Sequence, residues 1–384
     1  MATPAATYPS NTPVTLKHYF RRLKDPRRVH RRQHLLLDIV VIAICAVLCG
    51  ANTWPEVVTW AHYRRDWLQR LLTLPNGIPS HDTFERLFDR LDPLAFQKCF
   101  RDWIVAVCDS LELRHVAIDG KTLRRSGTDK LGPLHVVSAW ATANHLALGE
   151  VAVAEKSNEI TAIPRLLELL DVAGALVTID AMGCQKEIAK KIRERGGDYV
   201  LTVKDNQPNL LEDMQRCFTE AFNQEDTRLD HWETHEKKHG RSERRSYTVL
   251  RDPDGIRDSA AWQDLHVIGM CTSERTIGAD TSVEVRYFIG SRPAGANVYG
   301  KAVRSHWGVE NGLHWQMDIN FGEDASRIRR RGGAENFAVL RRIALSLLKQ
   351  HPAKMSIACK RLAAATDTDF LEEILKLAGN TGKP

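Results

Sequence analysis

Two short stretches, His115-Val-Ala-Ile-Asp119 and Ala175-Leu-Val-Thr-Ile-Asp180, decide the fold of this 384-residue chain. Both are rich in apolar and β-branched residues, which is typical of buried strands, and both end on an aspartate. Sheet proteins place their ligands in the crevice beyond the carboxyl ends of such strands. The two stretches therefore predict two carboxylates at one edge of a buried sheet.

The segments around these stretches predict an α/β fold. We expect three strands in a meander, followed by alternating helices and strands. This β-β-β-α-β-α-β order is that of a ribonuclease-H-like core, a mixed sheet flanked by helices, and it makes the strands of Asp119 and Asp180 neighbours. The expected elements are strands at 115–119, 135–142 and 147–154, a helix at 160–171, a strand at 175–179, a helix at 185–195 and a strand at 199–203.

The chain divides into five regions around this core. A helical N-terminal domain is expected at 1–112 and the first part of the core at 113–205. A β-rich subdomain is inserted at 206–290, the second part of the core follows at 291–350, and a C-terminal tail occupies 351–384. Within these regions we expect helices at 34–49, 54–72, 83–91 (capped by Ser80), 298–317 and 334–350, and strands at 246–250, 266–272 and 283–289.

A third acid, Glu310, lies in the second part of the core. His306, Glu310 and His314 are spaced four residues apart, which places them roughly on one helical face. Three carboxylates can hold a pair of divalent metal ions, Mg²⁺ or Mn²⁺, and such a pair cuts and rejoins phosphodiesters. Spacing alone leaves three other acids as competitors of Glu310 for the third place: Asp318, Glu323 and Asp324.

Each of these acids also has a plainer interpretation. A lone aspartate after a strand is commonly a turn or cap residue. The joint appearance of Asp119 and Asp180 at strand ends of one sheet favours the metal-ligand interpretation. For Trp307 and Trp315, beside Glu310, we favour packing in an amphipathic helix over a role in the site.

The charge of the chain favours a partner that carries phosphates. The formal net charge is +6, and seven basic residues crowd positions 21–32, among them Arg27 and Arg28. A second basic group lies at 327–331. For either run taken alone, a solvated face or a disordered arm is an equally good interpretation. The candidate DNA contacts are Arg27, Arg28, Lys121, Arg124, Arg125, Arg304, His306, Asn311 and His314.

Other patterns exclude several functional classes. The eight cysteines contain no Cys-x-x-Cys pair, which argues against zinc ribbons and disulfide frameworks and fits a reduced cytoplasmic compartment. The longest apolar run, 35–51, contains Asp38 and is shorter than the roughly 20 residues of a membrane span, so we expect a buried helix and no membrane association. His235-Glu-Lys-Lys-His239 matches the zinc-protease pattern, but its charged flanks and Gly240 do not suit the half-buried helix that such a site requires.

With these residues in place, the sequence resembles bacterial insertion-sequence transposases of the D-D-E class, and within that class the ISAs group that includes the H-repeat-associated proteins. The resemblance covers nearly the whole chain. It is carried by Lys24-Asp-Pro-Arg27, Leu48-Cys-Gly-Ala51, Gly77-Ile-Pro-Ser-His-Asp-Thr-Phe84, Ala117-Ile-Asp-Gly-Lys-Thr122, Lys156-Ser-Asn-Glu-Ile160, Thr178-Ile-Asp-Ala-Met182, Lys204-Asp-Asn-Gln207, His239-Gly-Arg-Ser-Glu243, the His306 to Trp315 segment and Glu323-Asp-Ala-Ser326.

The resemblance implies a catalytic triad of Asp119, Asp180 and Glu310 that binds two magnesium ions. It also implies DNA partners, namely terminal inverted repeats and target DNA, and a cytoplasmic, nucleoid-associated protein. A homodimer or larger assembly is expected because two element ends must be held together. A neighbouring group carries Tyr-x2-Arg-x3-Glu-x6-Lys around its glutamate. Here His306 and Met317 stand at the arginine and lysine positions, so those DNA contacts do not transfer, and Arg304 is a candidate substitute for the arginine.

Two alternatives stay open at this point. The chain could be a catalytically inactive DNA-binding descendant of a transposase, which occupies or regulates sites. It could also be a metal-dependent nuclease without strand transfer, because cutting and joining share the same first step.

Overall fold

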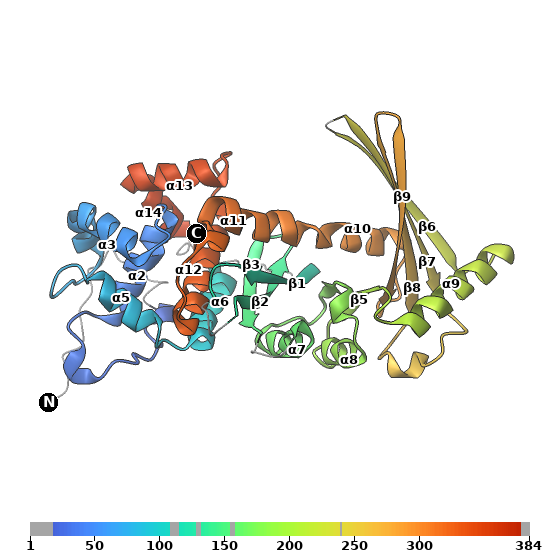
Figure 1. Cartoon of the computed structure of the whole chain (residues 1–384), viewed down its shortest axis with the longest axis horizontal. Helices are drawn as coiled ribbons and strands as arrows, with labels where there is room; N and C mark the ends of the chain where they lie inside the picture. The colour runs from blue at the N-terminus through green and yellow to red at the C-terminus, as the bar shows by residue number, and fades with distance from the viewer. Residues whose placement is uncertain (1–17, 108–114, 128–131, 154–157, 239, 378–384) are drawn as a thin grey trace, which may run out of the picture.

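A nine-stranded mixed sheet runs through the chain, with helices on both faces and a helical region at the N-terminal end (Figure 1). The computed structural model describes residues 18–107, 115–127, 132–153, 158–238 and 240–377. The strand order is β3-β2-β1-β4-β5-β9-β8-β7-β6. The strands are β1 His115–Leu123, β2 Leu134–Ala141, β3 Leu146–Ala152, β4 Leu176–Ile179, β5 Asp198–Val203, β6 Leu229–Lys238, β7 Arg241–Arg251, β8 Val267–Ile277 and β9 Asp280–Gly290.

The helices fall into an N-terminal group, a group that flanks the sheet and a C-terminal group. In the first group, α2 is buried from Leu37 to Leu48, and it packs against α12. The helices of eight or more residues are α2 Leu36–Leu48, α3 Trp54–Tyr63, α5 His81–Phe88, α6 Pro93–Val107, α7 Glu159–Leu169, α8 Lys186–Glu194, α9 Pro208–Asn223, α10 Ala296–His306, α12 Arg331–Gln350, α13 Ile357–Thr366 and α14 Thr368–Leu377; two shorter ones are α4 Arg65–Leu71 and α11 Trp315–Phe321. No helix in the described part of the chain is long and apolar enough to cross a membrane.

The expected neighbourhood of the two aspartate strands is confirmed. β1 and β4 are parallel, and Ile118 pairs with Ile179, so Asp119 and Asp180 are the next residues in register. One detail of the prediction was wrong: Asp119 is not the last residue of its strand, because β1 continues to Leu123 by antiparallel pairing with β2. Asp119 is nevertheless the first residue beyond the parallel pairing, which opens that edge of the sheet to a ligand.

The segment expected as a β-rich insertion continues the same sheet. β9 pairs antiparallel with β5, and β8, β7 and β6 follow it outward as long hairpins (Figure 1). The strands at 246–250, 266–272 and 283–289 were expected, but each is longer, and β6 was missed because its sequence is almost entirely polar. Residues 235–238 of the zinc-protease pattern lie in β6, whereas His239 is outside the described residues. A strand cannot present two histidines as a helix does, so the zinc-protease interpretation is excluded.

Two helices expected to be continuous are interrupted. The 54–72 helix breaks at Arg64 between α3 and α4. The 298–317 helix ends as α10 at His306, passes through a π-helical segment at Glu310–His314 and resumes as α11. The expected C-terminal tail contains two helices, α13 and α14, which pack on α12.

Candidate metal centre

The predicted acids Asp119, Asp180 and Glu310 line one cavity at the edge of the sheet. Asp119 comes from β1, Asp180 directly follows β4, and Glu310 begins the π-helical segment that crosses above them. The cavity has a volume of about 390 Å³. Its wall also contains Lys204, Arg286, His306 and Trp307, which bring positive charge, an imidazole and an indole to the cavity.

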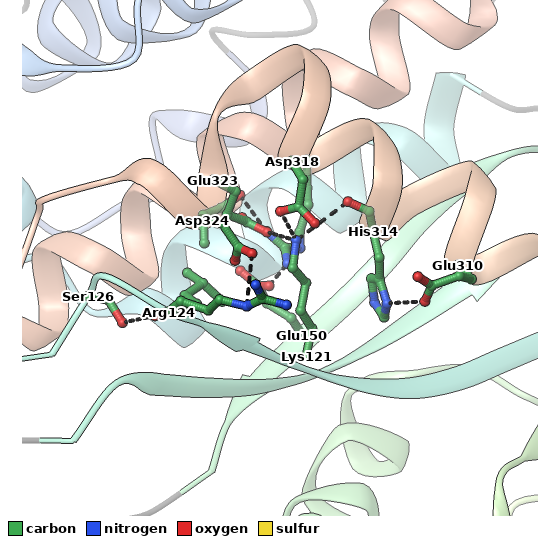
Figure 2. A network of polar contacts seen from close by, with 12 residues as sticks. Lys121, Arg124, Ser126, Glu150, Glu310, His314, Asp318, Glu323 and Asp324 are labelled. Carbon is green, nitrogen blue, oxygen red and sulfur yellow. Dashed lines mark hydrogen bonds and ion pairs between the residues drawn. The ribbon is translucent and has the colours of Figure 1, made fainter.

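His314 brings an imidazole nitrogen to this group of acids. Its Nδ1 lies 3.5 Å from Oδ2 of Asp119 and 3.5 Å from Oε2 of Glu310. Figure 2 shows the ring of His314 turned toward Glu310 beneath the helix that carries both. One ligand atom from each of Asp119, Glu310 and His314 lies within 4.8 Å of the others. This set of two carboxylates and one imidazole is chemically suited to a divalent cation.

Burial and neighbouring carboxylates disfavour the charged forms of the two aspartates. Burial, with a smaller contribution from Asp180, raises the pKa of Asp119 to about 6, although His314 opposes the rise. Burial, followed by the charge of Glu159, raises the pKa of Asp180. The neighbouring imidazole of His314 lowers the pKa of Glu310. Carboxylates that are crowded and desolvated in this way would be relieved by a bound cation.

A fourth carboxylate, Glu159, lies near the two aspartates and was not predicted from the sequence. It begins α7 and lies behind Gly120, where a Cβ atom would stand 2.1 Å from its Oε1. Oε1 of Glu159 is 2.7 Å from Nε2 of His135, whose Nδ1 is 2.7 Å from Oγ1 of Thr122. Glu159 falls within a segment that carried the family resemblance, but no local pattern of charge or spacing places it beside Asp180.

The three acids that competed with Glu310 are engaged elsewhere (Figure 2). Lys121 makes a short ion pair with Asp318 and lies 3.3 Å from Oε2 of Glu323. Arg342 contacts Glu323 at 2.8 Å, and Arg124 approaches Asp324 at 3.3 Å. Asp318 and Glu323 therefore tie their segments to Lys121 on β1, and among the four competing acids it is Glu310 that lines the cavity.

The candidate DNA contacts near the cavity differ in exposure. Lys121 is 9% exposed and is held by acids, and Nδ1 of His306 is bonded to Oγ1 of Thr178 at 2.9 Å. Three further candidates, Arg124, Arg125 and Asn311, are exposed. Arg304 is exposed as well, and it pairs with Glu236 at 3.3 Å. Their roles in DNA binding stay predictions.

Arg27 and Arg28 lie in a different place, the N-terminal helical region. They line a cavity of about 500 Å³ together with Arg86 and Arg90. Arg27 is held there by Asp25, at 2.8 Å, and by the carbonyl oxygen of His34. The structure thus separates the candidate DNA contacts into two basic locations.

Carboxylates that converge at one edge of a mixed α/β sheet, joined by an imidazole, define a protein with a candidate divalent-metal centre. Residues 110–347 match the family described as the transposase DDE domain, and residues 17–104 match its associated family, described as DDE_Tnp_1-associated. The chain belongs to the DDE transposase family, as the sequence resemblance predicted.

Similar proteins come from Escherichia coli. "Putative transposase YncI" of strain O157:H7 is 38% identical over 377 residues, which are 96% of each chain. "H repeat-associated putative transposase YhhI" of strain K12 is also 38% identical, over 95% of this chain and 98% of its own. Among solved structures, a piggyBac transposase synaptic complex with hairpin DNA aligns with 98% of this chain and 83% of its own at 11% identity and a TM-score of 0.42, a similarity too low to support an inference.

Proposed function

We propose that this protein is a DNA transposase. It binds the terminal inverted repeats of its own element, cuts a strand at each end and joins the freed end to target DNA. The convergence of Asp119, Asp180 and Glu310 on one cavity, in a chain of the DDE transposase family, carries this proposal.

We propose further that the catalytic core is ribonuclease-H-like. The strand order β3-β2-β1-β4-β5, with an antiparallel meander followed by parallel pairs, supports this assignment. In this proposal β6–β9 are the inserted segment, and the helical region before β1 is the family's associated domain. The cytoplasmic, nucleoid-associated location expected from the sequence stays a prediction.

The proposed reaction has two steps. A water oxygen bonds to the phosphorus at the element end and the bond to the 3′ oxygen breaks, which leaves a 5′-phosphate and a 3′-hydroxyl. That hydroxyl then attacks a target phosphate, and the bond to the target's 3′ oxygen breaks. When bound, two Mg²⁺ or Mn²⁺ ions would acidify the attacking group and stabilise the leaving oxygen.

The protein's own residues hold and orient the reacting groups. Asp119, Asp180 and Glu310 would bind the metal ions through oxygen. Lys204 and Arg286, which line the same cavity, would supply positive charge to the phosphate. Arg124, Arg125, Arg304 and Asn311 would contact the backbone on either side, and a homodimer or larger assembly would hold the two ends together.

The alternatives are an inactive DNA-binding descendant and a nuclease without strand transfer. A relative from Escherichia coli K12, "Inactive transposase YbfQ", is 36% identical over 63 residues, which are 16% of this chain. Because the three acids line one cavity here, we favour an active enzyme over the inactive descendant.

The test uses the purified full chain and DNA that spans both flanks of its own gene, with Mg²⁺ or Mn²⁺. We expect strand-specific nicks at repeat ends and, with added target plasmid, joined products. Glu310→Gln should bind the DNA but reduce nicking by at least 10²-fold, because a metal ligand is lost. Glu220→Gln, an exposed acid on α9, is the matched control and should cut normally. Binding without nicks would favour the inactive descendant, and nicks without joining would favour the nuclease.

A further inference from the structure

We propose that His314 is a metal ligand, so that Asp119, Glu310 and His314 form a site of two oxygen donors and one nitrogen donor. This inference deepens the proposed function and rests on it for the use of the metal. It differs from a site of carboxylates alone in the class of ion that it prefers. It also gives His314 a role at the metal in place of a contact with DNA.

The distances favour a shared metal ion over a hydrogen bond. Nδ1 of His314 is 3.5 Å from each of the two carboxylate oxygens. Hydrogen bonds to a carboxylate from a charged donor are about 2.7–2.9 Å long. Two ligands that each lie about 2.1 Å from one ion are about 3.0–3.4 Å apart when they are adjacent in octahedral or tetrahedral geometry. The observed separations are therefore close to those of neighbouring ligands and too long for strong hydrogen bonds.

The surroundings of the ring leave Nδ1 free to bind a metal. His314 is 4% exposed, and its second nitrogen, Nε2, is buried without a hydrogen-bond partner within the described residues. No group in the described part of the chain donates a hydrogen bond to Nε2, so nothing there forces the ring proton onto Nδ1. With the proton on Nε2, the lone pair of Nδ1 is available to a metal ion. Nζ of Lys121 lies 3.4 Å from the carbonyl oxygen of His314 and ties this turn of the helix to β1 (Figure 2).

Two neighbouring histidines are already engaged by hydroxyl groups. Nε2 of His115 is 2.8 Å from Oγ1 of Thr178, and its Nδ1 is 2.7 Å from Oγ1 of Thr142. The same Thr178 hydroxyl is bonded to Nδ1 of His306. His314, by contrast, faces two carboxylates, so it is the histidine at this end of the sheet that the geometry assigns to the metal.

A nitrogen donor changes the preferred ion. Mg²⁺ prefers oxygen ligands and keeps several waters, whereas imidazole suits first-row transition metals. We therefore infer that this site binds Mn²⁺ more tightly than Mg²⁺, by at least tenfold.

The experiment measures coordination directly and needs no DNA. Mn²⁺ is added to the metal-free full chain, binding is followed by the loss of free-ion electron paramagnetic resonance signal, and pulsed experiments record coupling to ¹⁴N. We expect the wild type to bind Mn²⁺ with ¹⁴N coupling. His314→Asn, which keeps a polar atom near the Nδ1 position, should lose this coupling and bind Mn²⁺ at least tenfold more weakly. His306→Asn is the matched control, because His306 lines the cavity of the acids but is engaged by Thr178, and it should keep the coupling.

Three results would overturn the proposal: no binding by the wild type at millimolar Mn²⁺, binding without ¹⁴N coupling, or coupling that survives in His314→Asn and is lost in His306→Asn. Circular dichroism of each variant shows whether it is folded, and a second variant, His314→Asp, offers oxygen only and should shift the preference toward Mg²⁺.

Nicking of element ends without ¹⁴N coupling would leave the proposed function intact and remove His314 from the metal. Coupling without nicking would leave the metal site intact and remove the transposase activity.

Discussion

Lys121 on β1 and Arg124, the first residue after that strand, both pair with acids, but only one pair is buried. The side chain of Lys121 is 9% exposed and that of Glu323 is fully buried, whereas the side chain of Arg124 is 81% exposed. Although burial opposes ionisation, Arg342 and Lys121 lower the pKa of Glu323 to about 2. The removal of a cation from a buried carboxylate lowers the free energy of unfolding substantially, whereas an exposed ion pair contributes little to it.

We therefore expect Lys121→Met to lower the free energy of unfolding by about 3 kcal/mol, because it leaves buried acids with fewer cations. Arg124→Met, the control directly after the same strand, should change it by less than about 0.5 kcal/mol. Urea unfolding of both variants at pH 7 measures the difference. Equal effects would show that Lys121 is not held in the buried network.

Asp38 gives a prediction about pH. Burial raises its pKa to about 6, although it accepts a hydrogen bond from the backbone N–H of Leu74 at 3.0 Å. Because its folded pKa lies above the unfolded value, the stability that it contributes is fully present below about pH 4 and is lost as the pH rises through about 6.

Asp38→Asn keeps an acceptor for Leu74 and removes the titration. The variant should gain stability relative to the wild type between pH 4 and pH 8, by at most about 3 kcal/mol. Chemical unfolding at several pH values measures the gain, and Asp66→Asn, at an exposed position on α4, is the control that should show none. A difference between Asp38→Asn and wild type that stays constant with pH would contradict the raised pKa.

At the scale of single residues, the sequence located the acids that end apolar strands but not those that depend on distant neighbours. Asp119 and Asp180 follow apolar runs, so their shared edge could be predicted from strand order. Glu159 could not, because its place depends on the space behind Gly120 and on His135 in another strand. Lys121 was expected to face phosphates. It pairs instead with Asp318 on α11, and this contact depends on packing between segments that are far apart in the sequence.

At the scale of elements, a π-helical segment carries both Glu310 and His314 and sets the angle between their side chains around the helix axis. Residues 310–314 form a wider turn between α10 and α11, a deviation often found at functional sites. Periodicity predicted one helix at 298–317, because a single additional residue in a turn does not disturb an amphipathic pattern enough to be recognised.

Deletion of Asn311 tests this element. Removal of one exposed residue from the segment should restore regular helical winding and change the spacing of Glu310 and His314 from four residues to three, which alters the angle between the two side chains around the helix axis and their alignment on Asp119. We expect binding of Mn²⁺ to fall by at least tenfold, measured by electron paramagnetic resonance. Asn311→Ala is the control, because it removes the same side chain without changing the winding, and it should retain binding. Undiminished binding in the deletion variant would show that the wider turn is not required.

At the scale of the whole molecule, the order of the strands was predictable but the extent of the sheet was not. The seven elements from β1 to β5 appear in the expected order, since apolar strands and amphipathic helices carry clear periodicity. β6 is almost entirely polar, and its pairing with β7 gives it a strand conformation that no local pattern predicts. The pairing of β9 with β5, which joins the hairpins to the core sheet, likewise depends on long-range contacts.

The two basic locations suggest how DNA would lie on the molecule. One is the cavity of Arg27, Arg28, Arg86 and Arg90 in the N-terminal helical region, and the other surrounds the acids at the edge of the sheet. Figure 1 shows the N-terminal helices at one end of an elongated molecule and the hairpins of β6–β9 at the other. DNA that reaches the acids would extend along the protein, so a site distant from the chemistry would contribute to affinity and not to the cutting step.

We therefore expect the double variant Arg86→Gln/Arg90→Gln to weaken binding to the element ends while leaving the rate of nicking at saturating protein within about twofold. For every phosphate that the variant no longer neutralises, the slope of log affinity against log salt should become shallower by about 0.9. Fluorescence anisotropy over a range of salt concentrations measures the slope, and single-turnover nicking measures the rate. Arg65→Gln, at an exposed position on α4 outside this cavity, is the control and should bind with the wild-type slope. An unchanged slope in the double variant would show that DNA does not contact the N-terminal cavity. The phosphate contacts would then come from the basic residues near Asp119, Asp180 and Glu310.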